Sequence, residues 1–218
     1  RSTKHGRDSV STHNTTRHAT GQSQHCEQPY DSADCHCGSG SSKTLVAGAP
    51  RVALAGAPNA GKTSIYNALT GLHAKTGNYP GVTVQRSMGT CKVGGKTLTI
   101  EDLPGAYSLD PISPDEQIVH DVLTGTSTTV SAPDALVIVV DATTLQRGMN
   151  FIAEALALEL PTCLVVTMTD ELTRRAGRLD VAALGQALGI PAVRVVGNRG
   201  IGIPELDRKS TRLNSSHS

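Results

Sequence analysis

One short loop places the strongest constraint on how this chain folds. The stretch GAPNAGKTSIYNALTG, residues 56–71, contains a glycine, four further residues, and then Gly61, Lys62 and Thr63. It follows the apolar run RVALAG, residues 51–56, which predicts a buried strand, and it leads into a helical pattern. A glycine-rich loop with this spacing between a strand and a helix cradles phosphate. The sequence therefore predicts a P-loop, in which Lys62 reaches the β- and γ-phosphates of a nucleoside triphosphate and the Thr63 hydroxyl ligates Mg²⁺.

The whole loop is expected to take part in nucleotide binding. Small side chains let backbone N–H groups curl round a phosphate, and the N-terminus of the following helix adds the positive end of a dipole. The expected binding residues of the loop are Gly56, Ala57, Pro58, Asn59, Ala60, Gly61, Lys62, Thr63 and Ser64.

Apolar runs alternate with helical patterns along the middle of the chain. Most of the runs are almost continuously apolar, as strands buried in a parallel sheet are. The expected strands are residues 51–56, 97–102, 135–141, 162–168 and 192–197, and residues 89–100 add a hairpin that turns at Gly94 and Gly95. Helices are expected at about 61–71, 113–124, 145–160 and 179–189. This order predicts an α/β fold of the P-loop NTPase type, with a doubly wound, mostly parallel six-stranded sheet and one antiparallel hairpin strand.

The two ends of the chain differ from its middle in composition. Residues 1–44 are rich in Ser, Thr, His, Gln and Gly and nearly lack branched apolar residues, which predicts a disordered leader. Residues 207–217, DRKSTRLNSSH, resemble what one reading frame of a common DNA sequencing-library adapter encodes. We therefore interpret residues 207–218 as a non-native tail, and we expect the nucleotide-binding domain at residues 45–206.

The leader contains a cluster of potential metal ligands. Thiolates and imidazoles suit Fe²⁺, Zn²⁺ or Ni²⁺. The spacing matches no regular metal site, so a metal-binding leader and a solvated low-complexity leader both stay open. The residues concerned are Cys26, Cys35, His36 and Cys37, with His5, His13, His18 and His25 nearby.

Charge and hydropathy exclude several classes of protein. The 20 Lys and Arg residues nearly balance the 19 Asp and Glu residues, and no basic stripe is present, so we expect no nucleic-acid partner. The longest strongly apolar run, residues 135–140, is far shorter than the roughly 20 residues of a spanning helix, so this chain is expected to be soluble. The five cysteines form no regular framework, which indicates a reducing, cytosolic compartment.

Two further segments indicate which kind of P-loop protein this is. In EDLPGAYSL, residues 101–109, Asp102 ends a predicted strand and Gly105 follows it. We expect the carboxylate to hold Mg²⁺ through water and the glycine N–H to sense the γ-phosphate. Between the two motifs, GNYPGVTV, residues 77–84, predicts a mobile loop in which Thr83 supplies a second hydroxyl to Mg²⁺. An ordinary loop threonine is the alternative.

Together these segments resemble the N-terminal G domain of bacterial ferrous iron transport protein B, from about Arg51 to Leu206. The resemblance rests on GAPNAGKTSIYNALTG, GNYPGVTV, DLPGAYSLDPISPDE and VIVVDATTLQRGMNF, of which the middle two are the most specific. It implies a Ras-like domain that binds GTP or GDP and regulates Fe²⁺ uptake through a membrane permease domain of the same full-length protein. It also implies a location on the cytoplasmic face of the bacterial inner membrane. Self-association stays open.

The resemblance also implies how GTP is hydrolysed. In Ras-like enzymes a glutamine after the D-x-x-G glycine orients the attacking water, but this position is Ala106. Backbone groups of the switch region and a K⁺ ion held partly by Asn59 would act instead, giving a slow, Mg²⁺-dependent GTPase stimulated by K⁺. An asparagine that merely tolerates the backbone of the loop is the alternative. The implied catalytic residues are Lys62, Asn59, Thr83 and Gly105.

The base-reading segments depart from the family pattern. Where N-x-x-D is expected after the fifth strand, the chain has TMTD, in which Thr167 replaces the asparagine and Asp170 is retained to accept the guanine N1 and N2 hydrogens. The later loop, VVGNRG, places Gly197 near the base, with Val196 and Asn198 in place of small polar residues. Guanine specificity is therefore less certain than phosphate binding.

Two other classes of protein stay open. One is a metallochaperone-type GTPase with a metal-binding leader, which the pairing of GNYPGVTV with DLPGAYSL argues against. The other is an Era-like, RNA-associated GTPase, which the missing basic RNA-binding module argues against.

Overall fold

A computed structural model describes residues 48–195 of the chain, apart from residues 73 and 94. The predicted leader and tail, and Gly197, lie outside these residues. The strands are β1 (Arg51–Ala55), β2 (Ala74–Asn78), β3 (Gln85–Val93), β4 (Lys96–Asp102), β5 (Ala135–Asp141), β6 (Thr162–Thr167) and β7 (Ala192–Arg194). The helices are α1 (Lys62–Thr70), α2 (Pro114–Thr124), α3 (Leu145–Leu156), α4 (Thr169–Arg174) and α5 (Val181–Leu188), with a 3₁₀ turn, η1, at Ala142–Thr144.

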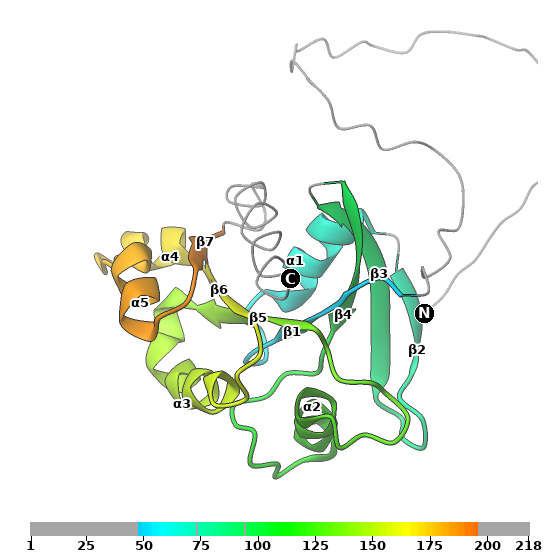
Figure 1. The fold of residues 1–218 in the computed structure, drawn as a ribbon. Coiled ribbons are helices and arrows are strands. Elements are labelled where there is room, and N and C mark those ends of the chain that lie inside the picture. The colour runs from blue at the N-terminus through cyan, green and yellow to red at the C-terminus, as the bar shows by residue number, and fades with distance from the viewer. Residues whose placement is uncertain (1–47, 73, 94, 196–218) are drawn as a thin grey trace, which may run out of the picture. The chain divides into compact units, whose positions relative to one another are not determined.

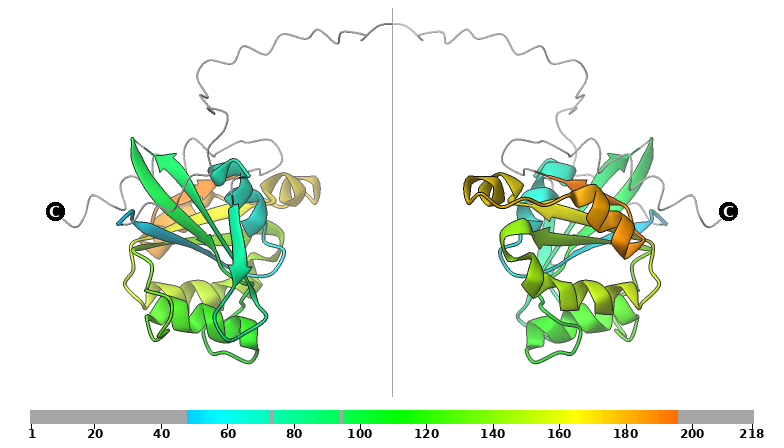
Figure 2. Two further views of the ribbon diagram at one scale, coloured as in Figure 1. Left: turned by 90° about the vertical axis from the view of Figure 1, so that its right-hand side faces the viewer. Right: turned by 90° about the vertical axis from the view of Figure 1, so that its left-hand side faces the viewer.

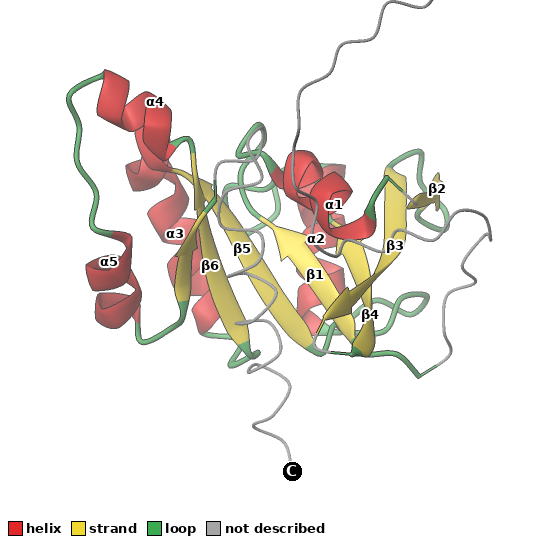
Figure 3. Ribbon diagram, turned by 90° about the horizontal axis from the view of Figure 1, so that it is seen from above, coloured by secondary structure: helices red, strands yellow, loops and turns green. Residues whose placement is uncertain are grey.

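The strands form one mixed sheet in the order β2-β3-β4-β1-β5-β6-β7. The strands from β4 to β7 pair in parallel, whereas β3 pairs antiparallel with β4 and β2 pairs antiparallel with β3 (Figure 3). The predicted α/β architecture is confirmed. The predicted number of six strands is wrong, because β2 adds a seventh at the antiparallel edge.

The extra strand takes up part of a segment that was predicted to be a loop. Gly77 and Asn78, the first residues of GNYPGVTV, belong to β2 and pair with Arg86 and Gln85 of β3. The sequence of β2, AKTGN, has no alternation of apolar and polar residues. Backbone pairing with β3 therefore holds this strand in place, and a hydrophobic pattern cannot reveal it.

Helices cover both faces of the sheet, α1 on one side and α2 and α3 on the other (Figures 1 and 2). Alternate residues of β1 enter the two cores: Val52 and Leu54 pack in the core of the α1 face, while Ala53 and Ala55 pack in that of the opposite face. This alternation is the period of two that a strand imposes on its side chains. Both faces of β5 are fully buried, which explains its uninterrupted apolar sequence.

The boundaries of α2 follow from its capping residues. The Ser113 side chain accepts a hydrogen bond from the Glu116 N–H, Pro114 occupies the first turn, and Gly125 ends the helix with a φ of 73°. The predicted start at residue 113 is therefore the N-cap itself. In the part of the chain that the structure describes, no helix has both the length and the apolar character needed to span a bilayer.

Candidate functional site

The predicted P-loop connects the end of β1 to the start of α1, as the sequence indicated. Gly56 has a φ of 142°, and a Cβ at this position would lie 2.1 Å from the carbonyl oxygen of Val139. Asn59 and Gly61 have φ values of 62° and 90°, in the region that asparagine and glycine tolerate best. Backbone geometry therefore accounts for the glycines of the motif, and it also supplies a structural reason for asparagine at position 59.

The Lys62 side chain lies over this loop and is buried. Its Nζ donates to the carbonyl oxygens of Gly56 at 3.0 Å and Ala57 at 2.9 Å. An ammonium group has three donors, so one is left for a phosphate oxygen. Burial lowers the pKa of Lys62, and the nearby Asp102 carboxylate opposes this effect. The amino group of Lys62 is therefore held at the P-loop backbone, close to the Asp102 carboxylate.

Thr63 and Asp102 meet across the start of α1 and the end of β4. The Thr63 hydroxyl donates to Asp102 Oδ2 at 3.0 Å. The other carboxylate oxygen, Oδ1, is buried and has no hydrogen-bond partner among the described residues. Burial raises the pKa of Asp102, while the Thr63 hydrogen bond and the charge of Lys62 act against the rise. A hydroxyl beside a carboxylate with an unsatisfied oxygen is a donor set that fits Mg²⁺.

The segment after β4 packs directly against the P-loop. A Cβ at Gly105 would lie 2.7 Å from Cγ and 2.9 Å from N and Cα of Pro58, so only glycine fits here. The next N–H, that of Ala106, donates to the Gly56 carbonyl oxygen at 3.1 Å. The Ala106 side chain is buried in the core. The structure thus explains why no side chain at position 106 positions a water molecule: this position faces the core.

A cavity of about 500 Å³ lies at this junction. Its walls come from the P-loop, α1, the end of β4 and the β2–β3 hairpin, and the predicted site residues among them are Pro58, Asn59, Lys62, Thr63, Asp102 and Gly105. The structure therefore brings the phosphate-binding and metal-binding candidates of two separate motifs to one place. Two of the metal-binding candidates, Thr63 and Asp102, are in direct contact.

Thr83 does not line this cavity, contrary to the expected arrangement. It is exposed in the loop of residues 79–84, between β2 and β3. Instead, Thr76, Gln85 and Ser87 of the β2–β3 hairpin line the cavity. Sequence reasoning missed these three residues, because their only signal is that they flank GNYPGVTV in a polar stretch. A role for Thr83 in binding Mg²⁺ requires the loop to move and stays a prediction.

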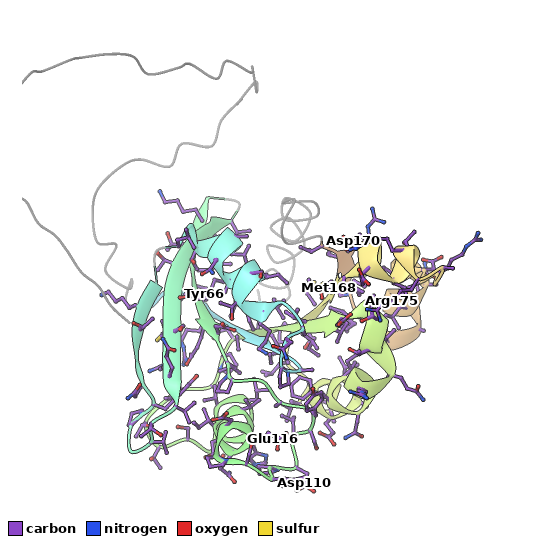
Figure 4. All side chains as sticks on the ribbon, turned by 180° about the vertical axis from the view of Figure 1, so that it is seen from behind. Tyr66, Asp110, Glu116, Met168, Asp170 and Arg175 are labelled. Atoms are coloured by element: carbon purple, nitrogen blue, oxygen red, sulfur yellow. The ribbon has the colours of Figure 1, made fainter. Side chains whose placement is uncertain are left out.

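Of the two described base-reading candidates, Thr167 is the last residue of β6 and Asp170 belongs to the following helix, α4 (Asp170 is labelled in Figure 4). Thr167 is buried, and its hydroxyl contacts the carbonyl oxygens of Ala60 at 2.7 Å and Val140 at 3.0 Å. It thus braces the P-loop, but one hydroxyl proton serves only one of these acceptors at a time. Asp170 lies in the first turn of α4, partly exposed and 3.6 Å from Arg174.

The architecture and the site together define a P-loop nucleotide-binding domain. A P-loop follows the first strand, and a carboxylate, that of Asp102, ends the adjacent parallel strand β4. Residues 50–210 match the family model described as "Ferrous iron transport protein B". The chain belongs to this family, and the matched residues form its N-terminal G domain.

Individual relatives agree with the family match. The Fe(2+) transport protein A/Fe(2+) transporter FeoB fusion protein of Porphyromonas gingivalis is 41% identical over 156 residues, which cover 72% of this chain and 18% of that protein. The G domain of the T. maritima FeoB iron transporter is 35% identical with a TM-score of 0.68, covering 76% of this chain and 98% of that one. The T. maritima cytosolic domain in its GMPPNP form is 34% identical with a TM-score of 0.68, covering 78% and 65%. The chain spans about a fifth of the length of the curated relatives it matches.

Proposed function

We propose that this chain is the GTP-binding and GTP-hydrolysing switch domain of a ferrous iron transporter. The observation that carries the proposal is that Lys62, Thr63 and Asp102 line one cavity, where Asp102 Oδ1 is buried and has no hydrogen-bond partner in the part of the chain that the structure describes. A P-loop lysine and a Mg²⁺-binding pair are the parts that phosphoryl transfer requires. The GMPPNP form of the T. maritima relative supports a guanine nucleotide as the ligand.

In this proposal each group has a separate task. The P-loop backbone and Lys62 bind the β- and γ-phosphates, and the Gly105 N–H senses the γ-phosphate. Thr63 and Asp102 hold Mg²⁺, which neutralises charge on the phosphate oxygens when it is bound. Thr83 supplies a second hydroxyl after its loop moves, and Asp170 and Thr167 lie on the side of the base; the predicted part of Gly197 lies outside the described residues.

The coupling to iron transport belongs to the same proposal. The relatives are described as Fe(2+) transporters and are about five times as long as the part they share with this chain. We therefore infer that a membrane permease domain is joined to this domain in the full-length protein, and that the G domain lies at the cytoplasmic face of the bacterial membrane. No observation favours the metallochaperone or RNA-associated alternatives.

The hydrolysis step tests the proposal through its dependence on monovalent cations. We expect the purified chain to release phosphate from GTP with Mg²⁺ faster in K⁺ than in Na⁺, because the Asn59 amide oxygen is a suitable K⁺ ligand and Ala106 offers no catalytic side chain. Asn59→Gly removes the amide and still suits the φ of 62°. This variant should lose the K⁺ response and retain GDP affinity, and Asn150→Ala on α3 serves as the control. Equal wild-type rates in the two salts, or a K⁺ response that survives in Asn59→Gly, would contradict the proposed role of Asn59.

A second prediction concerns the departure at position 167. Thr167→Asn is expected to strengthen GDP binding several-fold, because a carboxamide has two donors where the hydroxyl has one. One additional neutral hydrogen bond contributes about 0.5–1.5 kcal/mol, which is at most roughly tenfold in affinity. Thr167→Val, which leaves both carbonyl oxygens without this donor, should weaken binding. Calorimetric titration of GDP against the three proteins measures both effects, and unchanged or weaker binding by Thr167→Asn would refute the prediction.

A further inference from the structure

We propose that Glu101, acting through Tyr79, is a positioning residue: it fixes the base of the loop of residues 79–84 and so determines how Thr83 reaches the Mg²⁺ of the nucleotide site. The inference rests on the proposed function, because it assigns a structural cause to the behaviour of the switch loop. Neither Glu101 nor Tyr79 belongs to the phosphate-binding or base-reading groups described above.

Glu101 is the centre of a buried network of charged and polar groups. Its carboxylate is 1% exposed as a residue and accepts from Arg51 Nη2 at 2.5 Å, Arg86 Nε at 2.7 Å and the Tyr79 hydroxyl at 3.0 Å. The Arg86 guanidinium also lies over the Tyr79 ring, 5.5 Å from its centroid. The partners come from β1, from β3 and from the loop after β2. The Glu101 side chain therefore connects β4 to β1, to β3 and to the loop after β2.

All three partners of Glu101 donate hydrogen bonds to its carboxylate. Two positive charges lie beside the Glu101 carboxylate, because Arg51 Nη2 donates to Oε2 and Arg86 Nε donates to Oε1, which favours the ionised form. An ionised carboxylate is an acceptor only. The Tyr79 hydroxyl must therefore donate to Glu101, and this fixes the direction of the tyrosine side chain as well as its depth.

The position of Glu101 in β4 links this network to the metal site. Glu101 immediately precedes Asp102, and adjacent residues of a strand point to opposite faces of the sheet. Tyr79 packs in the core on the face of α2 and α3, together with Leu103. Asp102 instead meets Thr63 of α1 on the other face. One short stretch of β4 thus holds the metal-binding carboxylate on one side and the anchor of the switch loop on the other.

Hydrogen bonds fix the loop of residues 79–84 at Tyr79, whereas the tip of the loop is exposed. The Tyr79 N–H donates to the Val84 carbonyl oxygen at 2.9 Å, and the Val82 N–H donates to the Tyr79 carbonyl oxygen at 3.2 Å. Tyr79 is 4% exposed, whereas residues 80–83 are all exposed. Movement of Thr83 toward the cavity must therefore pivot about Tyr79. Without the hydrogen bond from Tyr79 to Glu101, the loop of residues 79–84 adopts a wider set of conformations. Binding of the Thr83 hydroxyl to Mg²⁺ then carries a larger loss of conformational entropy.

Tyr79→Phe is the variant that tests this inference. It removes a single oxygen atom and keeps the buried ring and its contact with Arg86, whereas removing Glu101 would leave two partly buried guanidinium groups without their carboxylate. We expect the Mg²⁺ concentration for half-maximal GTP hydrolysis to rise about tenfold, the effect of one hydrogen bond to a charged group. GDP affinity measured without Mg²⁺ should be unchanged, because the P-loop is untouched.

The control is Tyr107→Phe, since the Tyr107 side chain is 45% exposed and its hydroxyl has no hydrogen bond within the described residues. Its Mg²⁺ dependence should equal that of the wild type. Thermal unfolding of all variants checks that each one is folded. If Tyr79→Phe is folded and has the Mg²⁺ dependence of the wild type, the inference is overturned.

A double-mutant cycle with Thr83→Ala separates positioning from general stabilisation. If Glu101 acts through the loop on Thr83, Tyr79→Phe should have no further effect on the Mg²⁺ dependence once Thr83 is replaced. Additive effects would show that Tyr79 acts by another route and would overturn the inference. A Thr83→Ala variant with unchanged Mg²⁺ dependence would overturn it too, whereas a wild-type chain without GTP hydrolysis would instead refute the proposed function.

Discussion

Lys62→Ala is expected to abolish binding of nucleoside triphosphate. Lys62 is the buried cation of the P-loop, and its Nζ lies 3.0 Å and 2.9 Å from two carbonyl oxygens of the loop. Its removal deletes the positive charge that is expected to face the β- and γ-phosphates, together with the two hydrogen bonds that Nζ donates to these carbonyl oxygens. Charge-assisted hydrogen bonds of this kind are roughly twice as strong as neutral ones. We therefore expect no measurable binding of a GTP analogue at micromolar protein concentration.

The matched control for this variant is Lys92→Ala. Lys92 is an exposed lysine of β3, so the change in net charge is the same, while the P-loop is untouched. Binding is measured by titration with a fluorescent GTP analogue, and folding is checked by thermal unfolding. If a folded Lys62→Ala protein binds the GTP analogue with the affinity of the wild type, this loop does not bind the triphosphate. Loss of binding in both variants would point to net charge as the cause.

Asp170→Ala is expected to erase the preference for guanine over adenine. Its carboxylate lies in the first turn of α4, where we expect it to accept the N1 and N2 hydrogens of guanine, whereas adenine presents an acceptor at N1. Each hydrogen bond to a charged group contributes about 1.5–3 kcal/mol, so the preference that is lost should be at least roughly tenfold. The expected change is a weaker affinity for GDP with little change for ADP.

Glu171→Ala is the control for Asp170→Ala. Glu171 is the next residue on α4, has a similar exposure, and likewise pairs with Arg174. This variant also loses one negative charge, together with the two ion pairs that Glu171 makes with Arg174 and Arg175, but it should keep the preference for GDP. A preference for GDP that persists in Asp170→Ala would assign base reading to other residues.

The parallel part of the fold could be predicted because its physical cause is visible in local sequence. Residues 135–140 of β5 are buried on both faces, so every position must be apolar and the run is continuous. β2 has no such signal. It is held by backbone hydrogen bonds to β3, which are available to almost any sequence, and its side chains are largely polar. The sheet was therefore predicted with the correct class and with one strand too few.

The residues of the candidate site also differ in whether the local sequence could predict them. Lys62 and Thr63 could be placed because the P-loop spacing fixes a local backbone geometry, and Asp102 because it ends a strand that pairs with β1. The position of Thr83 could not, because its loop is set by the Tyr79–Glu101 contact across 22 residues. Glu101 itself appears in the sequence as an ordinary polar residue near a strand end. Its burial depends on Arg51 and Arg86 from two other strands, which no local pattern reveals.

Titration of GDP and ADP against the wild-type chain tests most directly whether this P-loop domain binds a guanine nucleotide. Asp170 lies in the first turn of α4, which follows β6 and Thr167, the residue whose hydroxyl contacts the Ala60 carbonyl oxygen of the P-loop. We expect GDP to bind at least about tenfold more tightly than ADP, because one hydrogen bond to a charged group has an effect of this size. Equal affinities for the two diphosphates would contradict the assignment as a GTPase, although the P-loop fold would stand.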